Sequence, residues 1–411
     1  MKENFILNRK KFLNKLENND LAVLYAGKAP VKRGDEFYPF TPDRNFYYVT
    51  GIDRENLILV MGKTEEGCFE RLYIEPDNGQ MARWVGANIT AKEAEEISGI
   101  KDIKFLSDLA EDLKNLASGT KRLFMDFERK DLNIKELTEE MRGIFGGIPF
   151  EDLFPVFAQM RVVKENWEIE LIRKAGDITR LGIEEMMKNA KPGMMEYEIE
   201  AYYDFVLRKN GVKDKAFQTI AASGMNGTVL HYMNNSKRTE ENDLILIDAG
   251  AQWEYYSGDI SRTFPVSGKF TPLQKTVYNI VLKGQQLIID NIKPGVMYPE
   301  LNEMLKEYYF DELKKLGLVK TKEEVFNYYF HGVSHFIGAE THDVGDRSQS
   351  LKPGMVISVE PGLYIEEWGI GIRIEDDALV TENGCEILTK NMIKTVEDIE
   401  RFMAESKNAW F

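Results

Sequence analysis

The chain has 411 residues, of which 43% are hydrophobic and 29% charged, so it has the composition of a folded globular protein. Its formal net charge of −15 argues against nucleic acid and anionic membranes as partners. The length suits two domains. Two cysteines, Cys68 and Cys385, exclude a disulfide scaffold and favour a reducing compartment. No apolar run reaches the roughly 20 residues that cross a bilayer, and the first residues lack the apolar region of a signal peptide. We therefore expect a cytoplasmic protein.

The first 150 residues alternate between helical and strand patterns. The spacing of apolar residues predicts helices over 5–18, 91–97 and 107–117, and strands over 20–25, 71–76 and 122–127. Residues 46–62 are interpreted as a strand, a turn near 51–54 and a second strand. This alternation predicts a layered α/β domain.

A domain boundary is expected near 150–163, where two prolines and a glycine pair interrupt the pattern. We place an N-terminal α/β domain at 1–155 and a catalytic domain at 156–411. Long amphipathic helices are predicted over 164–190 and 271–292, and each ends at Lys-Pro-Gly before another helix, over 197–209 and about 300–315. Lys-Pro-Gly is also a common helix stop, so the recurrence indicates either an internal duplication or two ordinary helix ends. We predict the duplication, with strands over 216–222, 243–250, 254–263, 355–365 and 370–380.

Two aspartates point to a metal site. Asp248 ends the apolar strand Leu-Ile-Leu-Ile-Asp, and Asp259 lies on the next predicted strand. A turn around 251–255 would make these strands antiparallel and the two carboxylates cross-strand neighbours. Such a buried pair repels unless it takes up a proton or a cation lies between them. The alternative is a strand-end cap or an ion pair.

A second group of acids lies at 355–377. The two-residue period of a strand places Ser358 and Glu360 on one face, before Pro-Gly breaks the ladder. In GIGIRIEDD the same period places Arg373 beside Glu375. A simple Arg–Glu pair would explain the latter, but four buried acids in two strand pairs favour a cation.

All four histidines lie between positions 231 and 342. His331 and His335 form an HxxxH sequence that lacks the glutamate of a zincin motif. An oxygen-rich set of four carboxylates and one imidazole suits hard divalent ions, manganese first, with cobalt or zinc as alternatives. Five such ligands can hold two ions about 3.5–4 Å apart. The proposed ligands are Asp248, Asp259, His335, Glu360 and Glu375.

The order DAG, SGDISRTFP, HGVSHFIG, THDVG, EPGLY and GIRIEDD resembles the pita-bread metallopeptidases, a family that includes methionine aminopeptidase, prolidase and aminopeptidase P. RNFYYVTG at 44–51 and RWVG at 83–86 resemble the N-terminal half of the aminopeptidase P type. The resemblance covers nearly the whole chain. It implies an α/β (α+β) fold with a pita-bread catalytic domain of pseudo-duplicated helices and strands.

The resemblance implies a role for each ligand. Asp248 and Asp259 would chelate one metal, and Asp259 and Glu375 would bridge both. His335 and Glu360 would complete the other, and Glu360 is the candidate to carry a proton to the leaving nitrogen. A hydroxide bridging the metals would attack the scissile carbonyl, with the substrate amine near Asp248.

Other residues surround this centre by resemblance. His231 would approach the scissile carbonyl, His331 and His342 would lie around the substrate, and Arg373 would hold a ligand carboxylate. Tyr364 and Arg347 would line the cleft, Arg161 would be a site arginine, and Trp84 would reach the site of a neighbouring subunit in a homodimer or homotetramer. Ordinary interface or domain contacts are the alternative for Trp84 and Arg161.

The leading hypothesis is an Xaa-Pro aminopeptidase, which acts on peptides with proline at position two. Prolidase, which cuts only Xaa-Pro dipeptides, is the main alternative; it needs a cationic group for the dipeptide carboxylate, and the sequence does not identify one. Methionine aminopeptidase does not need an N-terminal domain of this kind. A metal-silent peptide-binding scaffold is opposed by the complete ligand set. Loops near 343–352 and 366–369 are shorter than in the aminopeptidase P pattern, which leaves the extent of the pocket open.

Overall fold

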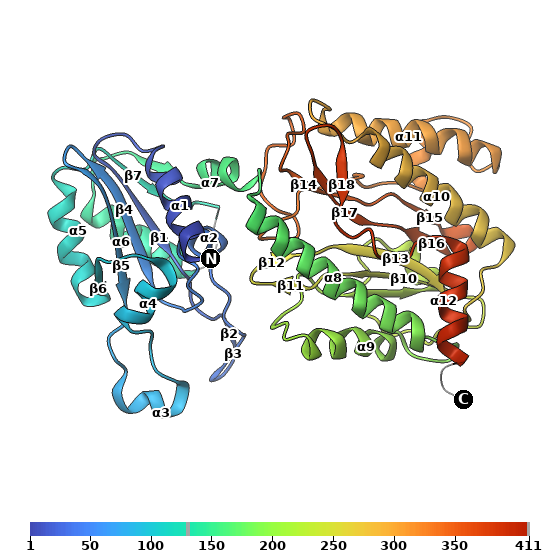
Figure 1. Cartoon of the computed structure of the whole chain (residues 1–411), viewed down its shortest axis with the longest axis horizontal. Helices are drawn as coiled ribbons and strands as arrows, with labels where there is room; N and C mark the ends of the chain where they lie inside the picture. Colours follow the sequence, from blue (N-terminus) through green and yellow to red (C-terminus); the bar gives the residue numbers. More distant parts are fainter. Residues whose placement is uncertain (129–131, 409–411) are drawn as a thin grey trace. The chain divides into compact units, whose positions relative to one another are not determined.

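The computed structural model describes residues 1–128 and 132–408, and its chain divides into two compact units (Figure 1). The first unit is Met1–Met160, and the second begins at Arg161. Helix α7 (Phe154–Arg161) spans both this division and the boundary predicted at residue 155.

The first unit is a mixed sheet with helices on both faces (Figure 1). Alternate side chains of β1 enter two separate cores, as the two-residue strand period requires: Leu21 and Val23 pack with α5 and α6, and Ala22 and Leu24 with α1, α2 and α4. The strand order is β6 (Ile103–Phe105), β5 (Gly67–Ile74), β4 (Ile58–Thr64), β1 (Asp20–Tyr25), β7 (Arg122–Met125) and β8 (Phe150–Asp152). The helices are α1 (Lys2–Leu13), α2 (Arg44–Thr50), α4 (Ala91–Ser98), α5 (Leu109–Ala117) and α6 (Leu132–Ile144). Two further segments lie outside this sheet. One is the hairpin of β2 (Val31–Arg33) and β3 (Glu36–Phe37), and the other is the short helix α3 (Ala82–Val85).

The strand predicted at the start of 46–62 is wrong, because these residues form helix α2. The side chain of Asp43 accepts a hydrogen bond from the backbone N–H of Phe46 at 2.8 Å and caps the helix. Gly51 ends it in the left-handed conformation with φ of 69°. The helix is buried on nearly all sides, and its apolar and aromatic residues, 46–49, are consecutive. Such a run shows no periodicity by which a helix could be distinguished from a strand.

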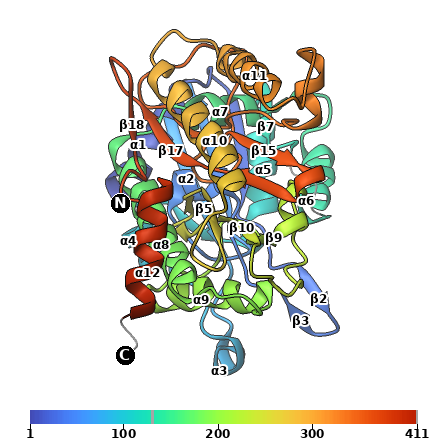
Figure 2. The ribbon, with the colours of Figure 1, turned by 90° about the vertical axis from the view of Figure 1, so that its right-hand side faces the viewer.

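The second unit contains two successive sets of helices and strands. The first set is α8 (Asn166–Asn189), α9 (Glu196–Lys209), β9 (Ile220–Ser223), β10 (Leu244–Ala249), β11 (Gln252–Trp253), β12 (Tyr256–Ser257) and β13 (Ile260–Pro265). The second set is α10 (Pro272–Asn291), α11 (Tyr298–Lys315), β14 (Val356–Val359), β15 (Gly362–Ile365), β16 (Ile370–Arg373), β17 (Asp376–Val380), β18 (Cys385–Ile387) and α12 (Val396–Asn408). Helix α8 packs on β10, β12 and β13, and α10 packs on β14, β15 and β16, so the strands lie between helices (Figure 2).

The two Lys-Pro-Gly segments have the same structure. Gly193 and Gly295 have φ of 90° and 89°, values that favour glycine. Their N–H groups donate to Thr239 O and Leu351 O, both at 2.9 Å. One isolated bridge then joins each following helix to the returning chain: Met195 with Arg238, and Met297 with Ser350. The recurrence is therefore a structural repeat, in which Glu196 and Tyr298 occupy equivalent positions at the start of α9 and α11.

Three predicted strands are interrupted in the structure. The segment 254–263 divides into β12 and β13, 355–365 into β14 and β15, and 370–380 into β16 and β17. At the first break Gly258 lies so close to Gly176 of α8 that a Cβ would meet its backbone nitrogen at 2.6 Å. At the second, Pro361 has no N–H to continue the ladder. The sequence predicted that Arg373 and Glu375 share one continuous strand, and this prediction is wrong because the strand ends at Arg373.

Across the described ranges 1–128 and 132–408, no helix is both long enough and apolar enough to cross a membrane.

Candidate active site and metal centre

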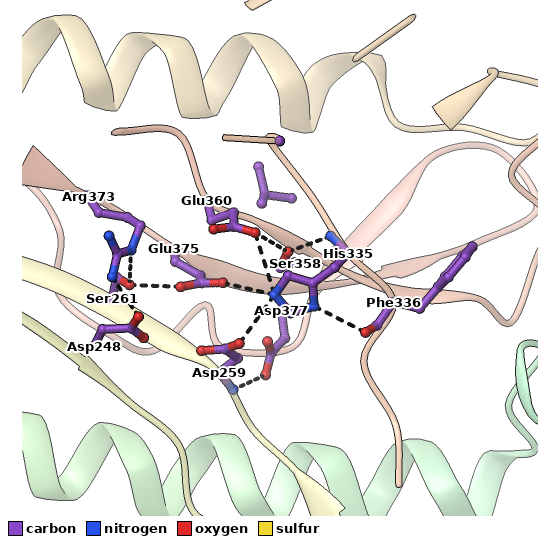
Figure 3. A network of polar contacts seen from close by, with 12 residues as sticks. Asp248, Asp259, Ser261, His335, Phe336, Ser358, Glu360, Arg373, Glu375 and Asp377 are labelled. Carbon is purple, nitrogen blue, oxygen red and sulfur yellow. Dashed lines mark hydrogen bonds and ion pairs between the residues drawn. The ribbon is translucent and has the colours of Figure 1, made fainter. Parts of the chain in front are cut away.

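The strand breaks hold three of the five predicted metal ligands. Asp259 lies between β12 and β13, Glu360 between β14 and β15, and Glu375 between β16 and β17. Asp248 lies within β10, where its antiparallel partner is Ser261 rather than Asp259. A residue at a break is free of the regular ladder, so its side chain can turn toward a shared centre (Figure 3).

His335 lies at the middle of this group (Figure 3). Its Nε2 is 3.4 Å from Asp259 Oδ2, 3.5 Å from Glu360 Oε1 and 3.8 Å from Glu375 Oε1. Its Nδ1 lies 3.1 Å from the carbonyl oxygen of Phe336, which can only accept a hydrogen bond. Nδ1 therefore carries the proton, and Nε2 presents its lone pair to the three carboxylates, as in histidines that bind metal.

Several carboxylate oxygens at this centre have no hydrogen-bond donor. Asp248 Oδ1, Asp259 Oδ1 and Glu375 Oε1 are buried and have no partner among the described residues. Burial, followed by the neighbouring carboxylates, raises the pKa of Asp259 and of Glu375 well above the usual range. One ligand atom from each of Asp259, His335 and Glu375 lies within 4.8 Å of the others. A divalent cation would satisfy these oxygens and keep the acids ionised, so the residues fit a metal site.

Three polar residues that the sequence analysis gave no role hold the ligands in place. Ser261 Oγ donates to Glu375 Oε2 at 2.8 Å, and Ser358 Oγ donates to Glu360 Oε1 at 3.3 Å. The backbone N–H of Asp259 donates to Asp377 Oδ2 at 3.2 Å, and burial raises the pKa of Asp377 to about 8. Each supporting residue lies two positions from a ligand in the chain, and this two-residue period is the signal that could have identified it.

A chain of hydrogen bonds leads from Asp248 to His331. Arg373 donates to Asp248 Oδ2 at 2.6 Å and to the Tyr364 hydroxyl at 2.8 Å. Tyr364 then donates to His331 Nε2 at 2.9 Å, because His331 Nδ1 already donates to Gly332 O at 2.8 Å. Burial, with Arg373 nearby, lowers the pKa of His331 to about 3, so this histidine is neutral. Arg373 thus forms its ion pair with Asp248. The simple Arg373–Glu375 pair, which was the alternative to a metal site, is not found among the described residues.

The centre opens into a cleft of about 630 Å³. Ten predicted residues line it: His231, Asp248, Asp259, His331, His335, His342, Arg347, Glu360, Arg373 and Glu375. Tyr364 is 3% exposed and reaches the cleft only through His331 and Arg373. Trp84 belongs to the first unit, where it is 84% exposed on α3.

Arg161 is buried and is not among the residues that line the cleft. It donates to Asp343 Oδ1 at 2.5 Å, and Lys164 donates to Asp343 Oδ2 at 2.9 Å. Asp343 follows His342, whose ring centre lies 4.3 Å from that of His335. The two cations therefore fix the loop that carries His342. No role was predicted for Lys164 or Asp343, although Asp343 lies within the THDVG motif.

Residues 170–382 match metallopeptidase family M24, and residues 5–124 match the aminopeptidase P N-terminal domain. The chain belongs to metallopeptidase family M24, and it is a metal-dependent hydrolase of that family.

The relatives cover both units. The Xaa-Pro aminopeptidase of Escherichia coli is 31% identical over 434 aligned positions, which cover 99% of this chain and 98% of the relative. A Bacillus anthracis protein assigned as an aminopeptidase P is 43% identical, with a TM-score of 0.96 and coverage of 98% and 99% of the two chains. The E. coli aminopeptidase P structure with the inhibitor Pro-Leu is 31% identical, with a TM-score of 0.94 and 99% coverage of both chains.

Proposed function

We propose that this protein is an Xaa-Pro aminopeptidase, which releases the first residue from peptides with proline at position two. The observation that carries the proposal is the group of three carboxylates around His335, from Asp259, Glu360 and Glu375, which line one cleft together with Asp248. Three oxygens of Asp248, Asp259 and Glu375 are buried and have no hydrogen-bond donor among the described residues. The end-to-end similarity to Xaa-Pro aminopeptidases supports the substrate class. It also supports a peptide as the substrate, since a related structure holds the inhibitor Pro-Leu.

The same five residues would hold two divalent cations. Asp248 and Asp259 would chelate one, Asp259 and Glu375 would bridge both, and His335 with Glu360 would complete the other. Manganese is our first choice, because four carboxylates and one imidazole form a hard donor set, and cobalt or zinc are the alternatives. When bound, two such ions supply Lewis acidity and lower the pKa of a water molecule toward neutrality.

The chain's own residues would orient the substrate and move protons. Glu360 lies at the cleft with its Oε1 hydrogen-bonded to Ser358, a position from which it can pass a proton to the leaving nitrogen. His231 and His342 lie on the walls of the cleft and would stabilise charge that develops on the scissile carbonyl oxygen. Neutral His331 would lie beside the substrate, held by Tyr364 and Arg373.

Prolidase activity remains the second candidate because of Arg347. The sequence alone identifies no cation for a dipeptide carboxylate. In the structure, Arg347 lines the cleft, and its guanidinium lies 5.7 Å from the ring centre of Tyr298. A cation at this wall could bind the carboxylate of a dipeptide or of a longer product. The N-terminal domain match still favours the aminopeptidase.

We further propose a cytoplasmic homodimer or homotetramer. Cys68 and Cys385 are both free thiols, which suits a reducing compartment. Met81, Trp84 and Val85, on or beside α3, are 55%, 84% and 75% exposed. Apolar side chains grouped in this way favour contact with another subunit, and Trp84 would be the residue that reaches a neighbouring site.

The function is tested by hydrolysis after chelation and reloading with Mn²⁺, with Gly-Pro, Ala-Pro-Ala and Ala-Ala-Ala assayed in parallel. Release of free alanine from Ala-Pro-Ala, but not from Ala-Ala-Ala, is the expected result. Cleavage of Gly-Pro alone would make the protein a prolidase. Equal cleavage of the two tripeptides would contradict proline selectivity, and cleavage of no peptide by the metal-loaded protein would overturn the proposed substrate class.

A further inference from the structure

We infer that Glu196 is a positioning residue for His231, because its carboxylate ties together the loop that carries this histidine. The inference rests on the aminopeptidase function proposed above, and it assigns to that function a residue outside the cleft. Glu196 is the first residue of α9 and is completely buried. It is not among the residues that line the cleft.

The segment from Val229 to Lys237 contains neither helix nor strand, and His231 within it is exposed. A side chain on such a segment has no ladder or helix to fix its direction, in contrast to the ligands on and beside the strands. Its position in the cleft therefore depends on contacts made by its neighbours in the loop.

One oxygen of Glu196 receives hydrogen bonds from the chain before this loop, and the other receives them from the loop itself. Oε1 accepts from the N–H of Ser223 at 2.7 Å, from the Ser223 hydroxyl at 2.8 Å and from the Asn226 side chain at 3.0 Å. Oε2 accepts from the Tyr232 hydroxyl at 3.0 Å and from the N–H of Lys237 at 2.8 Å. One carboxylate thus joins the chain before His231 to the chain after it.

The contacts of Tyr232 transmit this restraint to His231. Its hydroxyl donates to Glu196 and accepts from the N–H of Ser236 at 3.4 Å, which closes the loop on itself. The side chains of Leu230 and Tyr232 pack against the apolar cluster that contains Ile220. Both chain neighbours of His231 are therefore held, while His231 itself lines the cleft.

The repeat within the second unit shows that the Lys-Pro-Gly turn and the bridge after it form in the other half without a carboxylate at this position. The equivalent residue of α11 is Tyr298, and the Lys-Pro-Gly turn and the isolated bridge are the same in both halves. The glutamate is thus a feature of the half that carries His231. The hydrogen bonds around it point to what it does there.

Glu196→Gln tests the inference in the metal-loaded protein. A glutamine directs an NH₂ group at donors that need an acceptor, so at least one of the hydrogen bonds is lost. We expect kcat/KM for Ala-Pro-Ala to fall by about 10- to 100-fold, since a displacement of about 1 Å can cost that much. The matched control is Glu198→Gln, on the same helix, whose carboxylate accepts from the N–H of Met195 at 2.7 Å; it should leave the rate within about 2-fold.

A double-mutant cycle with His231→Ala separates positioning from a general structural effect. If Glu196 acts through His231, Glu196→Gln should change the rate by less than about 2-fold once His231 is alanine. An equal loss in both backgrounds, or no loss in the wild-type background, overturns the inference. Tyr232→Phe removes one donor without altering the buried carboxylate, so it gives the same cycle if Glu196→Gln does not fold.

Hydrogen exchange provides a readout that does not depend on catalysis. Glu196→Gln should accelerate amide exchange in residues 229–238 and leave residues 199–209 of α9 unchanged, with metal content equal to the wild type. Unchanged exchange in the loop contradicts the inference even if activity falls. A wild-type protein that cleaves no Xaa-Pro peptide would instead contradict the proposed function, and the exchange result would still report on the loop.

Discussion

His231 in the first half of the second unit and His342 in the second half both reach the cleft on loops, but the two loops are held by opposite arrangements of charge. In the first half the helix supplies the buried carboxylate, Glu196, and the loop supplies donors such as Tyr232. In the second half the loop supplies the carboxylate, Asp343, and Arg161 and Lys164 supply two cations. Two halves with the same arrangement of helices therefore use different side-chain chemistry to hold a loop that carries a histidine.

The difference has an energetic consequence. Removing one partner from a buried ion group leaves an unpaired charge, which costs about 3–5 kcal/mol, whereas losing one hydrogen bond from a buried group costs about 1–3 kcal/mol. We therefore expect the His342 loop to be coupled to global stability. The His231 loop, in contrast, should be coupled mainly to local geometry.

Both loops differ in turn from the four proposed carboxylate ligands, which lie within β10 or at the strand breaks. Asp248, Asp259 and Glu375 are buried, while His231 and His342 are exposed. Ligand substitutions should thus affect metal binding, and loop substitutions should leave it unchanged.

Asp259→Asn should produce the largest effect. It removes a charge from the proposed metal centre, and we expect loss of bound metal and a fall in kcat of at least about 10³-fold, since metal ions supply several kcal/mol of charge stabilisation. In the metal-free protein the same change removes a repelling carboxylate, so the free energy of unfolding should rise. Metal analysis and urea unfolding of stripped and loaded protein measure both effects.

The matched comparison is His231→Ala, which should lose activity and keep its metal. If His231→Ala also emptied the centre, the distinction between the proposed ligands and the histidine on the loop 229–237 would be wrong. If Asp259→Asn retained both metal and activity, the proposed ligand set would be wrong.

Asp343→Asn should produce the next largest effect, on stability. Replacing the carboxylate removes the buried anion between Arg161 and Lys164 and leaves Arg161 the half-exposed Glu340, at 3.6 Å, as an ion-pair partner, so we expect the free energy of unfolding at neutral pH to fall by about 3–5 kcal/mol. Asp346→Asn is the control on the same loop, because Asp346 is exposed; it should change stability by less than about 1 kcal/mol. If both variants lost a similar amount of unfolding free energy, the proposal that the buried ion group of Asp343 makes the loop of His342 important for global stability would be wrong.

The proposed ligands could be chosen from the sequence, and the structure brings them to one cleft, because their chemistry is local in the sequence. Each acid or histidine falls in an apolar segment, and buried charges of one sign imply a cation whatever the exact strand limits are. The long helices were predictable for a similar reason, since α8 and α10 have amphipathic stripes and end at Lys-Pro-Gly. These signals remain detectable when the predicted ends of a helix or strand are wrong by a few residues.

What was not predictable depends on contacts between distant parts of the chain. The break at Gly258 exists because α8 approaches at Gly176, and no local pattern reveals this. The sequence gives no sign that Asp343 and Glu196 have special roles. Their roles appear only in the structure, where Lys164 donates to Asp343 and Tyr232 donates to Glu196. Helix α2 was missed for the opposite reason, because burial on all sides removes the period on which the prediction relied.

Glu168 provides the smallest and most discriminating test of the charge network around Asp343. It is buried on α8, accepts from the Tyr256 hydroxyl at 2.8 Å, and has its pKa raised by burial from 4.5 to about 7. Between these values the folded protein keeps a proton that the unfolded chain has lost, so this group lowers stability as pH rises from about 4.5 to 7. Glu168→Gln should remove that loss.

The stability of Glu168→Gln relative to the wild type should therefore increase by up to about 3 kcal/mol between pH 4.5 and 7 and stay constant above pH 8. Urea unfolding of both proteins across this range measures the difference. Lys164 favours the ionised form of Glu168, and Asp343 opposes it. A difference that does not vary with pH would mean that Glu168 shares Lys164 with Asp343 and is ionised in the folded protein. The His342 loop would then be held by a larger charge network, and Asp343→Asn would cost less than an isolated buried group predicts, because Glu168 would still pair with Lys164.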